Sequence, residues 1–268
     1  MKKSFYCFLA FILVQYVCYV LVNTIWSVCT AEGKSFIDAL SWDRSIALQP
    51  TVLLVNSAVS SVITLLLFLH YKWTEVSSAW LRTRHWDVCV WSGVAALGTL
   101  VPCIWLQEQL PELPDLSADL FKQVMSSQYG YFVLCVFAPF VEEVVFRGAI
   151  LRSMLSAMSN RWLAIFVSAL FFAAAHMNPA QMPHALLVGL LLGWFYARTG
   201  SIIPSVAFHW VNNTATYAIY VLMPQAEDMT LLQFFGGNSV RVALAILFSM
   251  FLLLPALYQL NLRMCKAK

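Results

Sequence analysis

Long apolar stretches constrain this chain more than any other feature of its sequence. A helix that crosses the hydrocarbon core of a bilayer needs roughly 20 mostly apolar residues. We expect such helices at eight places, near residues 4–29, 50–70, 88–107, 131–154, 161–178, 183–197, 201–223 and 241–261. Asp, Glu, Lys and Arg make up only 11% of the residues, against about 25% in soluble globular proteins. The sequence therefore predicts an all-α, polytopic membrane bundle of about eight transmembrane helices, and it excludes disordered, collagen-like, coiled-coil and small disulfide-stapled chains.

Basic residues predict how these helices are oriented, because Lys and Arg gather on the cytoplasmic side of a membrane. If the N-terminus is cytoplasmic, eleven basic residues lie on that side and four on the other. The eleven are Lys2, Lys3, Lys72, Arg82, Arg84, Arg152, Arg161, Arg198, Arg263, Lys266 and Lys268. The four are Lys34, Arg44, Lys122 and Arg241. We therefore expect both termini in the cytoplasm, and we attribute the net charge of +3 to topology rather than to nucleic-acid binding.

Two segments beside the apolar stretches need separate interpretation. Lys2 and Lys3 precede an apolar run as in a signal peptide, but the run exceeds the usual length of about 7–15 residues, so we expect a retained first helix. Ahead of the fourth stretch, apolar residues recur at helical spacing beside Asp115, Asp119 and Lys122. This pattern predicts an interfacial amphipathic helix, and a loop with scattered leucines is the alternative. The apolar residues are Leu110, Leu113, Leu116, Leu120, Phe121, Val124 and Met125.

The fourth apolar stretch contains three charged side chains. An ionisable residue inside a span costs about 2.5–3.5 kcal/mol on insertion scales, so its presence indicates a function. Glu143 and Arg147 are four residues apart and can form an ion pair on one helix face. Glu142 is turned by about 100° from Glu143 and cannot share that pairing equally. We therefore expect one glutamate to be held structurally while the other is free for general-base chemistry.

Two later stretches each carry a pair of residues at helical spacing. The fifth contains Phe172 and His176, and the seventh contains His209 and Asn213. Hydrogen-bond donors side by side on one helix face can stabilise an oxyanion in a dry site. A single intramembrane His or Asn often only joins two helices. Three helices that each carry such a pair are better explained by one shared site.

The spacing of these residues resembles that of a known family. The three motifs of the CAAX-protease and bacteriocin-processing (CPBP, or Abi) family are similar, in order and spacing, to Glu142-Glu143-x-x-x-Arg147, Phe172-x-x-x-His176 and His209-x-x-x-Asn213. Members of that family are intramembrane glutamic endopeptidases. The resemblance covers about residues 110–225, and the first three stretches add nothing to it.

The resemblance implies a catalytic role for four residues. Glu142 would be the general base that activates a water, assisted by His176. His209 and Asn213 would form the oxyanion hole for the tetrahedral intermediate. The reaction would be hydrolysis of a hydrophobic or lipid-modified peptide or protein that reaches the site through the lipid bilayer, and we expect no cofactor. If the protein is bacterial, its membrane is expected to be the plasma membrane.

The same resemblance implies structural support and a division of the chain. Glu143, held by Arg147, would keep the shape of the site, and Phe172 would only pack against it. We expect three parts: N-terminal transmembrane helices at 1–109, a CPBP-like catalytic membrane core at 110–225, and a C-terminal transmembrane helix with a cytoplasmic tail at 226–268.

Other functions use the same residues differently. A zinc metalloprotease is one alternative, although the sequence has no compact zinc spacing such as His-Glu-x-x-His. Its possible ligands by type are Glu142, Glu143, His176 and His209, with His184 and Asn178 as additions. From different classes, the polar residues could form the path of an ion- or proton-coupled transporter, or remain in a non-catalytic immunity protein. Loss of proteolysis after exhaustive chelation would favour zinc.

Overall fold

The computed structural model describes residues 2–30, 49–75, 79–82, 85–226 and 229–266. Within these ranges every regular element is a helix, so the predicted all-α bundle is confirmed. Some of the basic residues used to predict the orientation lie outside the described residues, namely Lys34, Arg44, Arg84 and Lys268.

Four helices in the described part are long and apolar enough to cross a membrane. They are α1 (Lys2–Thr30), α4 (Pro50–His70), α6 (Trp86–Glu108) and α14 (Ser239–Arg263). These four correspond to the first three predicted stretches and to the last one. The other predicted stretches are also helical, but a count of eight spans is not confirmed.

The central helices differ from these four in length and composition. α10 (Arg161–Ala175) has 15 residues and is apolar but short. α11 (Met182–Thr199) and α12 (Ile203–Leu222) are longer but carry polar side chains within their length. The helices that fall short as simple spans are therefore those that carry the residues singled out by the sequence.

The fourth predicted stretch folds as a continuous series of helical segments with two wider, π-helical parts. The series is η1 (Phe132–Phe137), α8 (Ala138–Glu143), η2 (Val144–Leu151) and α9 (Arg152–Ala157), with η1 and η2 π-helical. A wider helix loosens the regular backbone ladder, and its carbonyls then need other donors. Hydroxyls from three other segments donate to η2: Ser4 to Ile150 O at 3.2 Å, Thr74 to Val144 O at 2.8 Å and Ser168 to Phe146 O at 3.3 Å.

The predicted interfacial helix is wrong over its first half. The structure has a helix only at α7 (Ala118–Met125), and residues 110–117 are not helical. Pro111 and Pro114 explain the difference, because proline lacks a backbone N–H and restricts the residue before it to extended conformations. Instead of forming a helix, this connector is bound to the rest of the chain: Asn178 donates to Asp115 Oδ1 at 2.8 Å and to Ser117 Oγ at 2.7 Å.

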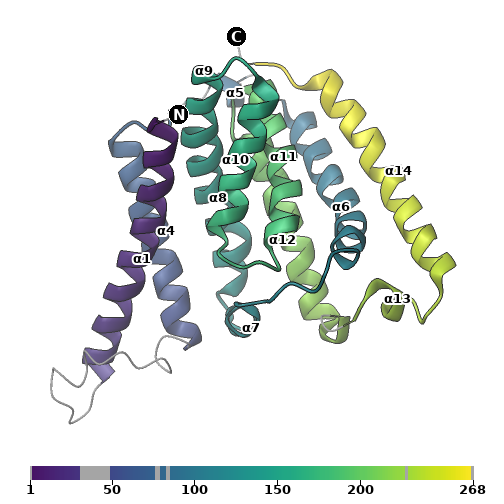
Figure 1. Cartoon of the computed structure of the whole chain (residues 1–268), viewed down its shortest axis with the longest axis horizontal. Helices are drawn as coiled ribbons and strands as arrows, with labels where there is room; N and C mark the ends of the chain where they lie inside the picture. Colours follow the sequence, from purple (N-terminus) through teal and green to yellow (C-terminus); the bar gives the residue numbers. More distant parts are fainter. Residues whose placement is uncertain (1, 31–48, 76–78, 83–84, 227–228, 267–268) are drawn as a thin grey trace.

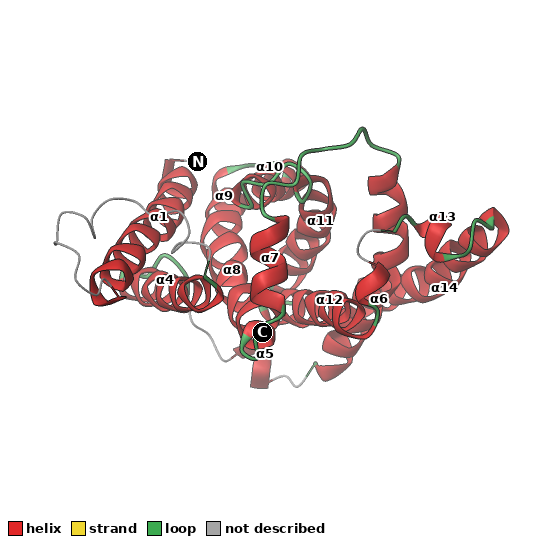
Figure 2. Cartoon of the chain, turned by 90° about the horizontal axis from the view of Figure 1, so that it is seen from below, coloured by secondary structure: helices red, strands yellow, loops and turns green. Residues whose placement is uncertain are grey.

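In the view of Figure 1, α1 and α4 lie at one side, α8 to α12 in the middle, and α6 and α14 at the other side. Both termini lie at one end of the molecule together with α5 (Ala79–Arg82) and α9, whereas α7 and α13 (Leu231–Phe234) lie at the other end. Viewed from the α7 end, α7 crosses below the middle helices (Figure 2). We refer to these as the terminal end and the α7 end.

Close approach between α10 and α11 depends on two glycines four residues apart. A Cβ added at Gly189 would lie 3.1 Å from the Ala169 Cβ, and one added at Gly193 would lie 2.8 Å from the Ile165 Cγ2. Small residues at this spacing let helices in membranes pack backbone to backbone. The contact brings Phe172 on α10 next to α11, beside the site described below.

Candidate active site

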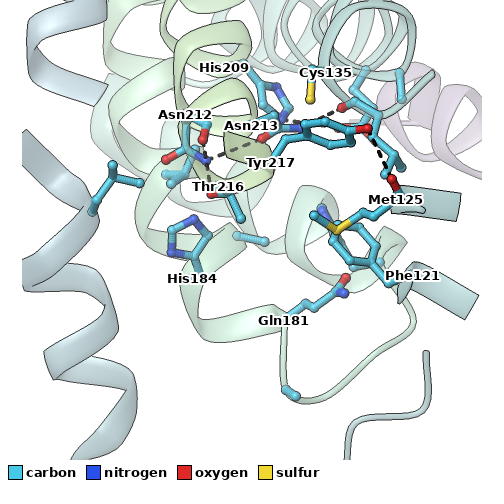
Figure 3. Close-up of a pocket in the computed structure, with 18 of the residues that line it drawn as sticks. Phe121, Met125, Cys135, Gln181, His184, His209, Asn212, Asn213, Thr216 and Tyr217 are labelled. Carbon is cyan, nitrogen blue, oxygen red and sulfur yellow. Dashed lines mark hydrogen bonds and ion pairs between the residues drawn. The ribbon is translucent and has the colours of Figure 1, made fainter. Parts of the chain in front are cut away.

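A cavity of about 470 Å³ lies among α6, α7, α8, α10, α11 and α12. Five of the residues predicted from the sequence line it: Glu142, Phe172, His176, His209 and Asn213. Figure 3 shows His209, Asn213 and Asn212 of α12 facing the same space as His184 of α11. The structure thus brings residues from all three sequence motifs to one cavity.

The two adjacent glutamates differ in exposure and in partners. The Glu142 side chain lines the cavity and is 26% exposed, whereas that of Glu143 is 0% exposed. Arg147 Nη1 donates to Glu143 Oε1 at 2.9 Å, which is the ion pair expected from their spacing. Glu142 Oε2 lies 3.7 Å from His209 Nε2, beyond hydrogen-bond distance. The Glu142 carboxylate is therefore open to a water in the cavity.

Arg147 is buried and makes contacts on three sides. Besides its bond to Glu143, Arg147 Nη2 donates to the Gly189 carbonyl of α11 at 3.3 Å. The guanidinium carbon also lies 4.3 Å from the centre of the Phe172 ring, within the range of a cation–π interaction. The helical spacing predicted the contact with Glu143 but not the two contacts with other helices. Arg147 thus joins η2 to α10 and α11.

His209 connects the buried glutamate to the cavity. Its Nδ1 lies 3.0 Å from Glu143 Oε1, and since a carboxylate only accepts, Nδ1 is the donor. Its Nε2 then points toward Glu142. The ring is 5% exposed and stands edge to face with Phe172 at a centroid distance of 5.8 Å. The orientation of His209 is therefore set by Glu143 and by the Phe172 ring.

His176 is oriented by its own helix. Its Nδ1 lies 2.9 Å from the carbonyl oxygen of Phe172, and a carbonyl can only accept, so Nδ1–H donates. In the neutral ring Nε2 then carries a lone pair and can accept a proton or a hydrogen bond. The Phe172 ring stands edge to face with His176 at 5.0 Å. Phe172 thus contacts both histidines and Arg147, as expected of a packing residue.

Asn213 makes a hydrogen bond within the protein that its predicted role in the oxyanion hole does not include. Its Nδ2 donates to the carbonyl oxygen of Leu134 in η1 at 2.9 Å. In a π-helix that carbonyl would accept from the residue five positions later, which is Pro139 and has no N–H. Asn213 supplies the missing donor. One hydrogen of its amide is therefore used within the protein, and the other remains for a ligand.

Asn212 and His184 are among the other polar residues that line the cavity. Asn212 is 5% exposed, and within the described chain its Oδ1 has no hydrogen-bond partner. His184 faces the cavity from the first turn of α11, although the sequence equally allowed an interfacial position. Asn212 is three residues from His209, a spacing that also places two residues on one helix face, so this spacing is the signal in the sequence that could have identified it.

The described residues contain no group of three or more His, Cys, Asp and Glu side chains arranged to hold a metal ion. Glu143, one of the possible zinc ligands by type, is bound to Arg147 and His209 instead. Within the described cavity Glu143 is therefore not placed to bind zinc.

Residues 126–215 match the family described as Rce1-like, type II CAAX prenyl endopeptidase. The matched segment contains all three motifs, so the family recognised from their spacing is confirmed over this segment. Together with the apolar helices, the match identifies an integral membrane protein and an intramembrane peptidase of the CAAX-protease type. No curated protein and no solved structure matches the chain.

Proposed function

We propose that this protein is an intramembrane glutamic endopeptidase in which Glu142 activates a water. The observation that carries the proposal is the unequal placement of two adjacent carboxylates. Glu143 is buried and bound to Arg147 and His209, whereas Glu142 faces the cavity. A base must reach its water, and only Glu142 of the pair is open to one.

In the proposed reaction Glu142 takes a proton from water while the water oxygen attacks the scissile carbonyl carbon. His176 assists by accepting a hydrogen bond from the same water at Nε2, since its Nδ1 is already engaged with the Phe172 carbonyl. Collapse of the tetrahedral intermediate breaks the C–N bond, and Glu142 returns the proton to the leaving nitrogen. The products are a carboxylate and an amine, with no acyl-enzyme.

The negative charge that develops on the carbonyl oxygen requires donors. The free amide hydrogen of Asn213 is one, and His209 Nε2 is the other. Because His209 Nδ1 already donates to Glu143, donation from Nε2 requires the doubly protonated ring. The Glu143 carboxylate accepts from Nδ1 of this ring and so holds its Nε2 toward the cavity, which gives Glu143 a supporting role.

The substrate we propose is a hydrophobic or lipid-modified peptide that approaches from the bilayer. Apolar side chains from several helices form much of the cavity wall, among them Leu100, Ile104, Met125, Leu134 and Val188. The matched family carries prenyl endopeptidase in its description, and a prenylated peptide is one member of this class. An apolar wall is also suited to an unmodified hydrophobic peptide.

The test compares membrane-associated peptides in three strains, which contain the wild-type protein, Glu142→Gln and Glu112→Gln. Glu112 is an exposed acid that does not line the cavity, so it provides a matched control. We expect processed peptides with wild type and Glu112→Gln, and their unprocessed precursors with Glu142→Gln at an equal protein level. Identical peptides in all three strains would contradict the proposal. Loss of processing by purified wild type after chelation would favour zinc instead.

A further inference from the structure

In the described part of the chain, the cavity opens toward one end of the molecule. Its lining residues lie between the level of Glu142, where the proposed water binds, and the α7 end. The lining residues nearest to the terminal end are Glu142 on α8, Phe172 on α10, Val188 on α11 and His209 on α12. One turn farther toward the terminal end, the side chains are packed and at most 2% exposed. These are Val145, Phe146, Ala169, Leu192 and Ser205. A peptide therefore cannot enter from the terminal end without opening this core.

The rim of the cavity lies at the α7 end. Gln107 at the end of α6 and Asp115 in the connector both line the cavity and are exposed. Phe121 of α7 lines it as well and is 38% exposed. Gln107 Nε2 donates to the Ala180 carbonyl at 2.9 Å, which joins α6 to the connector between α10 and α11. The rim is thus built from segments at the end of the molecule opposite to the two termini (Figure 1).

Charge is distributed unequally between the two ends. The described basic residues of the terminal end are Lys2, Lys3, Lys72, Arg82, Arg152, Arg161, Arg198, Arg263 and Lys266. Those of the α7 end are Lys122 and Arg241. The described acidic residues of that end include Glu108, Asp115 and Asp119. An excess of Lys and Arg marks the cytoplasmic side of a membrane protein, so the terminal end is cytoplasmic and the α7 end is not.

We propose that the cavity opens on the extracytoplasmic face and receives peptide segments exposed on that face. That the cavity receives a substrate rests on the proposed function. The direction in which the cavity opens follows from packing and charge alone. Its consequence is a substrate class: exported or membrane-anchored hydrophobic peptides with their cleavage site outside the cytoplasm. A protein modified at its C-terminus in the cytoplasm would meet the closed, terminal end.

The test labels exposed cysteines in intact bacterial cells that produce the full chain. Cys29 near the end of α1 and Cys265 after α14 are both exposed and lie at opposite ends, so they serve as internal controls. Three versions keep one exposed cysteine each: Cys29 with Cys265→Ser, Cys265 with Cys29→Ser, and Gln107→Cys with both native cysteines replaced. The chain with Cys29→Ser and Cys265→Ser gives the background from the other cysteines.

A membrane-impermeant sulfonated maleimide is the probe. We expect Gln107→Cys and Cys29 to react equally in intact and permeabilised cells, and Cys265 to react only after permeabilisation. Reaction of Cys265 in intact cells with protection of Gln107→Cys would overturn the proposal. Equal reaction of all three cysteines in intact cells would also overturn it, because the protein would then insert in two orientations. A Gln107→Cys that never reacts would overturn it as well, because the rim would then be closed.

A second measurement separates this inference from the proposed function. The cleavage sites that depend on Glu142 are mapped by sequencing the new termini of membrane-associated peptides. We expect these sites in segments outside the cytoplasm, and sites in cytoplasmic segments would overturn the inference. If no cleavage depends on Glu142, the proposed function fails, whereas the labelling still reports which face the cavity opens to.

Discussion

Replacing Arg147 by Met removes one charge of a buried pair while keeping a long side chain. Arg147 is 1% exposed and Glu143 is 0% exposed. The substitution leaves the Glu143 carboxylate with His209 as its remaining partner. Breaking a buried ion pair by removing one partner typically costs about 3–5 kcal/mol, because the other charge stays desolvated. We expect a loss of unfolding free energy in this range for Arg147→Met.

The double variant Glu143→Gln/Arg147→Met tests the reason for that loss. It leaves neither charge of the buried pair, and the amide oxygen introduced by Glu143→Gln can still accept a hydrogen bond from His209. We therefore expect the double variant to be less destabilised than the sum of the two single variants, because residues in direct contact are energetically coupled. The measurement is the free energy of unfolding of the purified proteins in mixed detergent micelles.

The ion pair between Arg152 and Glu75 provides the matched control. It joins the same residue types, Arg152 at the start of α9 and Glu75 after α4, but these side chains are 34% and 71% exposed. Exposed pairs contribute about 0–1 kcal/mol, so Arg152→Met should lower stability far less than Arg147→Met. If both substitutions have the same effect, or if the effects of Glu143→Gln and Arg147→Met simply add, the reasoning about the buried pair is refuted.

Two further predictions concern packing and the histidines. Gly98→Ala would place a Cβ 2.7 Å from the backbone nitrogen of Leu253, whereas the Cβ of Gly93→Ala would lie 3.3 Å from a Val211 methyl. The free energy of unfolding should fall by about 1–3 kcal/mol for Gly98→Ala and by less for Gly93→Ala. Equal losses would contradict this prediction. His176→Ala should abolish peptide cleavage without changing stability, because the hydrogen bond of its ring is made to its own helix. His209→Ala should lower both the cleavage activity and the free energy of unfolding. An unchanged free energy of unfolding would contradict the contact between His209 and Glu143.

The helical fold and the meeting of the three sequence motifs at one cavity follow from the sequence because both depend on local spacing. Apolar length predicts a membrane helix, and residues four apart share a helix face. Glu143 and Arg147 therefore meet as expected, and Glu142 faces elsewhere. Pro111 and Pro114 interrupt the helical spacing of the leucines, so the non-helical connector also has a local cause in the sequence.

Other features depend on contacts between segments that local spacing does not contain. In the π-helical η1, the Leu134 carbonyl accepts a hydrogen bond from Asn213, which lies 79 residues away in the sequence. The contacts of Arg147 with Gly189 and Phe172 require α10, α11 and η2 to pack together. The direction in which the cavity opens likewise emerges only when the helices are assembled. Tertiary packing, rather than periodicity, decides these features.

The most direct test of the central claim is the rate of peptide cleavage by Glu142→Gln. The purified protein is reconstituted in lipid vesicles with a peptide identified by the comparison of strains, and kcat is measured for wild type and for Glu142→Gln with equal unfolding free energies. Loss of a general base typically costs about 10²–10⁴ in rate. We predict a fall of kcat in this range for Glu142→Gln. Cleavage by Glu142→Gln at the wild-type rate would contradict the account.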